Sequence, residues 1–196
     1  MNRKILSLLL ALCLLLSLTA CGDAEPDAPD VPDAPEQGDP VQPAADGGEE
    51  SWAIYWYLCG SDLEGDGGFA TDDLAELMEV ELPENVTVVI QTGGASTWWN
   101  DLIDAEKLQR WVYDSQGLTL VDEQPSASMG EASTLADFLS FANENYPASR
   151  KAVLFWNHGG GSVSGAAFDE LYDLDSLTLD EMYAAFSAVW QENAAQ

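Results

Sequence analysis

The chain has 196 residues, of which 35 are acidic and 6 are lysine or arginine, so its formal net charge is −29. Such a charge argues against nucleic acid or an anionic lipid surface as a partner, because phosphate groups would be repelled. It is compatible with cationic substrates, although charge alone favours the simpler interpretation that it keeps the protein soluble at a crowded cell surface.

The first twenty residues have the pattern of a secretory signal peptide. The basic residues Arg3 and Lys4 precede an apolar run from Ile5 to Leu18, which is shorter than the roughly 20 residues of a membrane-spanning helix. The run closes on Leu18-Thr19-Ala20-Cys21, which is similar to a bacterial lipobox. We therefore expect residues 1–20 to be a lipoprotein signal peptide, Cys21 to carry lipid, and the protein to be extracytoplasmic and anchored to the bacterial cell membrane. The alternative is ordinary secretion with a chance cysteine.

Residues 21–50 have the composition of a disordered tether. From residue 22 onward they contain no lysine or arginine, and acidic residues alternate with six prolines. Almost nothing there could bury apolar surface, so the segment should be extended and self-repelling. One domain is expected over residues 51–196. If Cys21 is lipidated and Cys13 is removed with the signal peptide, Cys59 has no partner for a disulfide, and the domain depends on its core.

From residue 52 onward, strand patterns alternate with helix patterns. Buried strands are expected at residues 53–58, 86–90 and 152–156, and a hairpin or side excursion at residues 111–121. Thr71 is expected to cap the first helix, and Thr178 with Glu181 has the spacing of a capping box on the last. A helix between them carries Leu135, Phe138, Leu139 and Ala142. This order predicts an α/β fold with a mostly parallel sheet flanked by helices.

The candidate site residues follow the three buried strands. They are Cys59-Gly60, Thr92-Gly93-Gly94 and Asn157-His158-Gly159-Gly160-Gly161. Ligands bind beyond the carboxyl ends of such strands, and glycine lets the backbone approach a ligand closely. His158, the only histidine, could act there as a general base beside backbone N–H groups that hold an oxyanion.

Other interpretations of these residues stay open. A lone histidine is more often structural, and Cys59 is a candidate nucleophile for which a buried structural role is favoured, because no basic neighbour would lower its pKa. Acidic residues and a glycine fit part of an EF-hand frame, but a solvated acidic loop is favoured; they are Asp62, Glu64, Asp66, Gly67 and Asp73. Calcium therefore has little support, and with one histidine and no Cys-x-x-Cys a zinc site is not expected.

Three ordered motifs resemble the clostripain family of cysteine peptidases, in the caspase-like group. They are Tyr57-Leu58-Cys59-Gly60-Ser61-Asp62-Leu63-Glu64, then Val88-Val89-Ile90-Gln91-Thr92-Gly93-Gly94-Ala95, then Leu154-Phe155-Trp156-Asn157-His158-Gly159-Gly160-Gly161. The resemblance covers residues 52–190 and implies a peptidase that needs no cofactor and cleaves peptides or proteins after basic residues. It also implies that His158 is the catalytic histidine, that the N–H of Gly159 helps to hold the oxyanion, and that Cys59 is not the nucleophile.

The element that carries the family's nucleophile, a strand followed by Asp-x-Cys, has no match after Thr178. We therefore expect the chain to contain only the amino-terminal part of the peptidase domain, and to be inactive and marginally stable by itself. One alternative is a non-catalytic surface lipoprotein that binds peptides on the same scaffold. Another is a lipase-type hydrolase, since His-Gly-Gly-Gly also occurs there, but the Gly-x-Ser-x-Gly motif of such enzymes is absent.

Overall fold

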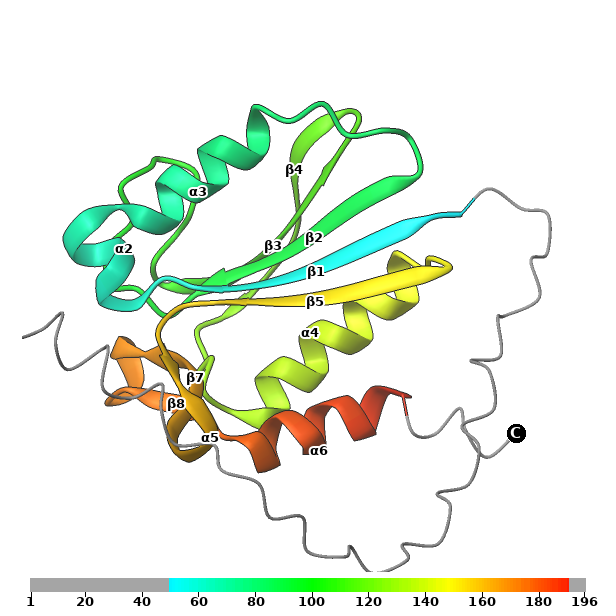
Figure 1. Cartoon of the computed structure of the whole chain (residues 1–196). Helices are drawn as coiled ribbons and strands as arrows, with labels where there is room; N and C mark the ends of the chain where they lie inside the picture. Colours follow the sequence, from blue (N-terminus) through cyan, green and yellow to red (C-terminus); the bar gives the residue numbers. More distant parts are fainter. Residues whose placement is uncertain (1–49, 191–196) are drawn as a thin grey trace, which may run out of the picture. The chain divides into compact units, whose positions relative to one another are not determined.

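The computed structural model describes residues 50–190, and the expected signal peptide, tether and Cys21 lie outside them (Figure 1). Its centre is a five-stranded sheet with the strand order β4-β3-β2-β1-β5. The parallel strands are β1 (Trp52–Cys59), β2 (Val86–Gly93) and β5 (Arg150–Trp156). The hairpin of β3 (Lys107–Asp114) and β4 (Gly117–Pro125) adds two antiparallel strands beside β2. The expected α/β fold is confirmed.

Helices cover both faces of this sheet. In Figure 1, α2 (Ser61–Gly67) and α3 (Phe69–Met78) lie above it, while α4 (Ala132–Asn145) and α6 (Leu179–Trp190) lie below it. Alternate side chains of a strand point to opposite faces. Accordingly, Tyr55 and Tyr57 of β1 pack on the α4 side, whereas Trp56 and Leu58 pack on the α3 side. Burial on both faces explains why the pattern of this strand is continuously apolar.

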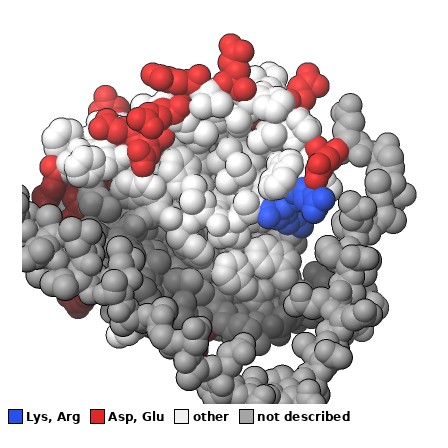
Figure 2. Space-filling model, in the orientation of Figure 1, with Lys and Arg blue, Asp and Glu red and all other residues white. Residues whose placement is uncertain are grey.

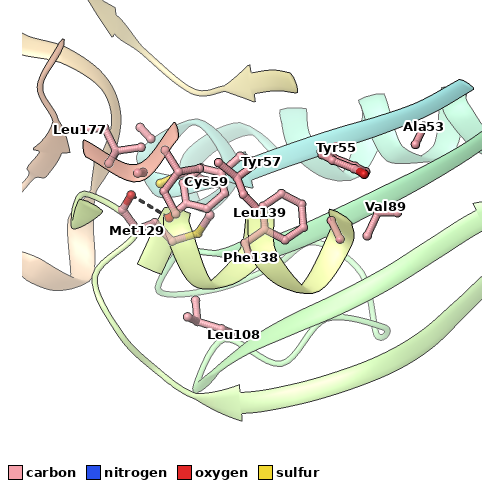
Figure 3. Packing of buried hydrophobic residues seen from close by; sticks show 14 of the residues in the cluster. Ala53, Tyr55, Tyr57, Cys59, Val89, Leu108, Met129, Phe138, Leu139 and Leu177 are labelled. Atoms are coloured by element: carbon pink, nitrogen blue, oxygen red, sulfur yellow. Dashed lines mark hydrogen bonds between the residues drawn. The ribbon is translucent and has the colours of Figure 1, made fainter. Parts of the chain in front are cut away.

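The larger of the two cores lies between the sheet and α4. Phe138 and Leu139 of α4 are fully buried against Tyr55 and Tyr57 (Figure 3). The hydroxyl of Tyr57 would be costly to bury without a partner, and it donates a hydrogen bond of 3.0 Å to the carbonyl of Met129. The helix predicted around Leu135, Phe138, Leu139 and Ala142 is confirmed as α4, and these four side chains are fully buried.

The strand β5 differs from the expectation of a third buried strand. It pairs with β1 on one side, and no other described strand pairs with its outer edge. Its first three residues are exposed, and Leu154 is 49% exposed. The apolar pattern predicted the strand correctly, but burial depends on what lies beside the strand, which the pattern does not contain.

The acidic segment after β1 is helical, so the expected solvated loop is wrong. Glu64 of α2 is fully buried, and its carboxylate accepts hydrogen bonds from the backbone N–H and the hydroxyl of Thr71 and from the N–H of Trp99. The expected cap at Thr71 is also wrong, because α3 begins at Phe69 and Thr71 lies inside it. The Thr71 side chain contacts Glu64 of the preceding helix instead of capping its own.

A small second sheet, which the sequence patterns did not predict, packs near the carboxyl ends of β1 and β5. It has the order β6-β7-β8, formed by β6 (Gly159–Gly160), β7 (Gly165–Asp169) and β8 (Asp175–Leu177). The four-residue helix α5 (Gly161–Ser164) and the 3-10 turn η1 (Glu170–Tyr172) connect its strands. The predicted capping box is confirmed, since Thr178 and Glu181 exchange side-chain and backbone hydrogen bonds at the start of α6.

Candidate active site

The three motifs meet at the carboxyl edge of the parallel strands. Cys59 of β1 is in register with Gly93 of β2, and Leu58 is in register with Trp156 of β5. The chain continues this pairing after the strand, as the N–H of Gly60 donates to the carbonyl of Gly93 at 2.9 Å. Residues separated by about a hundred positions are therefore placed side by side, as the parallel arrangement predicts.

His158 follows β5 and reaches back to α2. Its Nε2 lies 3.0 Å from Oδ1 of Asp62, and both side chains are about half exposed, at 49% and 51%. Partial burial raises the pKa of the Asp62 carboxyl, but hydrogen bonds with His158 and Ser61 outweigh this, so its pKa lies below the ordinary value. The imidazole is accessible to a substrate while one of its nitrogens is occupied.

Asn157 fixes the backbone directly before His158. Its side-chain N–H₂ donates to the carbonyl of Cys59 at 2.9 Å, and its oxygen accepts the N–H of Phe168 at 2.8 Å. The end of β5 is thereby tied to the end of β1 and to β7. The sequence motif contained this asparagine. Its bridging role could not be predicted, because it depends on β7, a strand that the sequence patterns did not predict.

The glycines after the strands serve two different purposes. At Gly94, φ is +76°, and a Cβ there would lie 2.5 Å from the sulfur of Cys59. Here glycine allows the chain to pack closely against β1. By contrast, Gly159 and Gly161 are exposed and have no atom within 4 Å of an added Cβ. The backbone that follows His158 is therefore exposed at these two positions.

Cys59 is buried on the inner side of this edge. Its side chain is fully buried, and its sulfur donates to the carbonyl of Phe168 at 3.5 Å. Burial raises the pKa of the thiol, and the nearby carboxylates of Asp169 and Glu170 raise it further. A thiol with a raised pKa forms little thiolate, which is the nucleophilic species. This environment agrees with the structural role favoured for Cys59.

The other carboxylates at this edge already have partners. Asp169 is fully buried and accepts hydrogen bonds from the N–H groups of Met129 and Leu171. Glu170 accepts the N–H of Ser96. Because Glu64 is also occupied, the EF-hand frame does not gather its acids around a cavity. Within residues 50–190, no group of three or more His, Cys, Asp or Glu side chains is arranged to hold a metal ion.

Comparison with known proteins decides the family. The sequence model of the clostripain family matches residues 56–193, which includes all the elements that form this edge. The chain belongs to the clostripain family. No curated protein matched it in sequence.

A solved structure supports the same fold. A secreted C11 cysteine protease from Bacteroides thetaiotaomicron, solved with an irreversible peptide inhibitor, is 18% identical to this clostripain-family chain, with a TM-score of 0.56. The match covers 71% of this chain and 39% of that one, so the chain spans less than half of that protease. A B. fragilis cysteine protease is 16% identical with a TM-score of 0.45, and the match covers 57% of this chain and 91% of that one.

Proposed function

We propose that this clostripain-like chain supplies the histidine part of a cysteine endopeptidase site, with His158 as general base and acid. The supporting observation is the half-exposed imidazole of His158 at the carboxyl edge, whose Nε2 lies 3.0 Å from Asp62, next to the exposed backbone of Gly159. His158 would remove the proton of a cysteine thiol, and the thiolate would attack the peptide carbonyl to give an acyl-enzyme. The N–H of Gly159 would stabilise the oxyanion, and His158 would then protonate the leaving amine.

The proposed nucleophile is not Cys59. Among the described residues, Cys59 is the one free cysteine, and it is buried with a raised thiol pKa. The remaining two cysteines of the chain, Cys13 and Cys21, belong to the expected signal peptide and its cleavage point. We therefore expect these 196 residues to be inactive without a further cysteine beside His158.

The proposed substrates are peptides or proteins with a basic residue before the cleaved bond. Figure 2 shows acidic side chains gathered over the part of the surface where α2 and α3 lie, and α2 carries Asp62. Together with the formal net charge of −29, this surface would attract cationic substrates. The family membership supports a peptide substrate, and the charge supports the basic preference.

Peptide cleavage by protein expressed from its own gene locus, where any further part or partner is present, tests this function. Fluorogenic peptides with Arg, Lys or Leu before the cleaved bond are compared with and without a thiol reductant. We expect thiol-dependent cleavage after Arg and Lys, and a loss of about 10²- to 10⁴-fold or more in His158→Ala. Unchanged cleavage in His158→Ala would refute the assignment. Thiol-dependent cleavage by the purified 196-residue chain would contradict its expected inactivity.

A second candidate function is peptide binding without catalysis, favoured by the burial of Cys59. In that case the purified chain binds arginyl peptides, and His158→Ala binds them equally well. Calorimetric titration with a non-cleavable arginyl peptide measures this binding. The cleavage assay separates the two functions, because only the catalytic proposal requires His158 for cleavage.

We also propose that the protein is held outside the cytoplasm by lipid on Cys21. The signal-peptide pattern and lipobox support this location. Among the described helices, none is both long and apolar enough to cross a membrane. Metabolic labelling with an alkyne fatty acid should tag the wild type and leave Cys21→Ala untagged. Equal labelling of both would exclude Cys21 as the attachment site.

A further inference from the structure

The contact between Asp62 and His158 joins two segments that are 96 residues apart in sequence. An imidazole on an exposed loop can rotate and exchange its proton between two nitrogens. A carboxylate at 3.0 Å from Nε2 selects one ring orientation and the tautomer that carries the proton on Nε2. The other nitrogen, Nδ1, is then left without a proton and able to accept one.

Asp62 lies on a helix whose position is fixed from within the protein. The buried carboxylate of Glu64, on the same short helix, accepts three hydrogen bonds from Thr71 and Trp99. The indole N–H of Trp99 also donates to the carbonyl of Gly65 at 3.0 Å. These contacts tie α2 to α3 and to the loop after β2. Asp62 therefore lies on a helix, α2, whose position is fixed. Asn157 in turn fixes the backbone beside the imidazole.

The neighbouring acids that could serve His158 in place of Asp62 are engaged elsewhere. On α3, Asp73 accepts the indole N–H of Trp156. At the end of β7, Asp169 and the following Glu170 accept backbone N–H groups. On α2 itself, Glu64 is buried among its own donors, and Asp66 is exposed one turn further along the helix. Asp62 is thus the acid that the fold directs to the imidazole.

We propose that Asp62 is the positioning residue of the site: it holds His158 through Nε2, so that Nδ1 is the nitrogen that exchanges the proton with the nucleophile and the leaving amine. This inference rests on the proposed function of His158. The pair is half exposed, so solvent weakens the contact and it adds little to stability. Its contribution is the orientation of the ring. The pKa of the Asp62 carboxyl, below its ordinary value partly because of His158, agrees with this contact.

Nuclear magnetic resonance of the full chain tests the inference, because His158 is the only histidine and its ring signals need no further assignment. Long-range proton–nitrogen correlations are recorded at a pH where the ring is neutral. We expect the wild type to show Nε2 protonated and Nδ1 unprotonated. In Asp62→Asn the two nitrogen shifts should move toward each other as the tautomers mix, while the matched variant Asp66→Asn on the same helix keeps the wild-type shifts. Identical nitrogen shifts in wild type and Asp62→Asn would overturn the proposal.

A second variant keeps the test valid if Asp62→Asn disturbs the fold. In His158→Gln, the pKa of the Asp62 carboxyl should rise toward its ordinary value, as followed by carbon resonance of the labelled carboxyl. An unchanged pKa would also overturn the proposal. Neither readout depends on peptide cleavage. Unchanged cleavage in His158→Ala would therefore refute the catalytic role of His158 and leave the contact between Asp62 and His158 standing. A negative result in the magnetic resonance tests would instead leave His158 as a base that is oriented by another group.

Discussion

At the scale of single residues, buried acids determine how this site is held together. Glu64 and Asp169 are both fully buried, and each accepts hydrogen bonds from backbone N–H groups. A buried carboxylate is costly unless such donors surround it. The two residues make different connections. Glu64 joins two helices to a loop, while Asp169 joins β7 to the turn before α4 through Met129.

Glu64→Ala should destabilise the domain by about 2 to 4 kcal/mol, because it leaves the N–H groups of Thr71 and Trp99 without their acceptor. Urea denaturation followed by tryptophan fluorescence measures the change in unfolding free energy. Asp66→Ala, an exposed acid on the same helix, serves as control and should change it by less than about 0.5 kcal/mol. Equal effects of the two variants would contradict the role given to Glu64.

Asp169 should make stability depend on pH in the acid range. Burial raises the pKa of its carboxyl, and the hydrogen bonds from Met129 and Leu171 only partly offset this. The folded state therefore binds this proton more tightly than the unfolded state. Its contribution to stability decreases as pH rises from the ordinary carboxyl pKa through the raised one. The free energy of unfolding of wild type minus that of Asp169→Asn should accordingly fall over this range. A difference that stays constant or rises would show that the pKa is not raised.

At the scale of elements, local sequence signals predicted helices and strands well where hydrogen-bonding groups find their partners within a few residues. The capping box before α6 is such a case, because Thr178 and Glu181 bond to each other within four residues. Thr71 is the opposite case, since its hydroxyl had a partner seven residues away that a capping pattern does not contain. The small sheet of β6, β7 and β8 has strands too short for a recognisable period.

Thr178→Ala should destabilise α6 and the domain by about 1 kcal/mol, since the N–H of Glu181 loses its acceptor. Thr178→Ser keeps the hydroxyl and should retain most of that stability. Thermal unfolding followed by circular dichroism measures both variants. If Ser and Ala are equally destabilising, the lost methyl group and not the cap is responsible.

At the scale of the whole molecule, charge and the open edge of β5 act in opposite directions. Within residues 50–190 the outer edge of β5 pairs with no strand, and Leu154 of this strand is exposed. Such an edge favours association with other chains. The net charge of −29 opposes association through repulsion between copies. On the face shown in Figure 2, Lys and Arg side chains gather in one place, at the end of the sheet where β5 begins. This balance makes the state of association depend on salt.

Purified chain should therefore be mostly monomeric at about 0.02 M salt and associate at about 0.5 M, where charge repulsion is screened. Sedimentation velocity at both salt concentrations measures this. Leu154→Lys places a charge on the edge and should reduce association at high salt, while Val163→Lys, at an exposed residue away from the edge, should not. Reversible, cooperative unfolding of a monomer at both salt concentrations would contradict the predicted tendency to associate.

The sequence by itself determined the class of fold, the order of the main strands and helices, the family and the candidate role of His158. These follow from periodic patterns and ordered motifs, which are local properties of the chain. Only the tertiary structure decided that Asp62 meets His158, that Cys59 and Asp169 are buried together, and that Asn157 ties the end of β5 to β1 and β7. Each of these contacts depends on which segments, distant in sequence, the parallel strands bring to one edge of the sheet. A pattern along the chain does not contain that information.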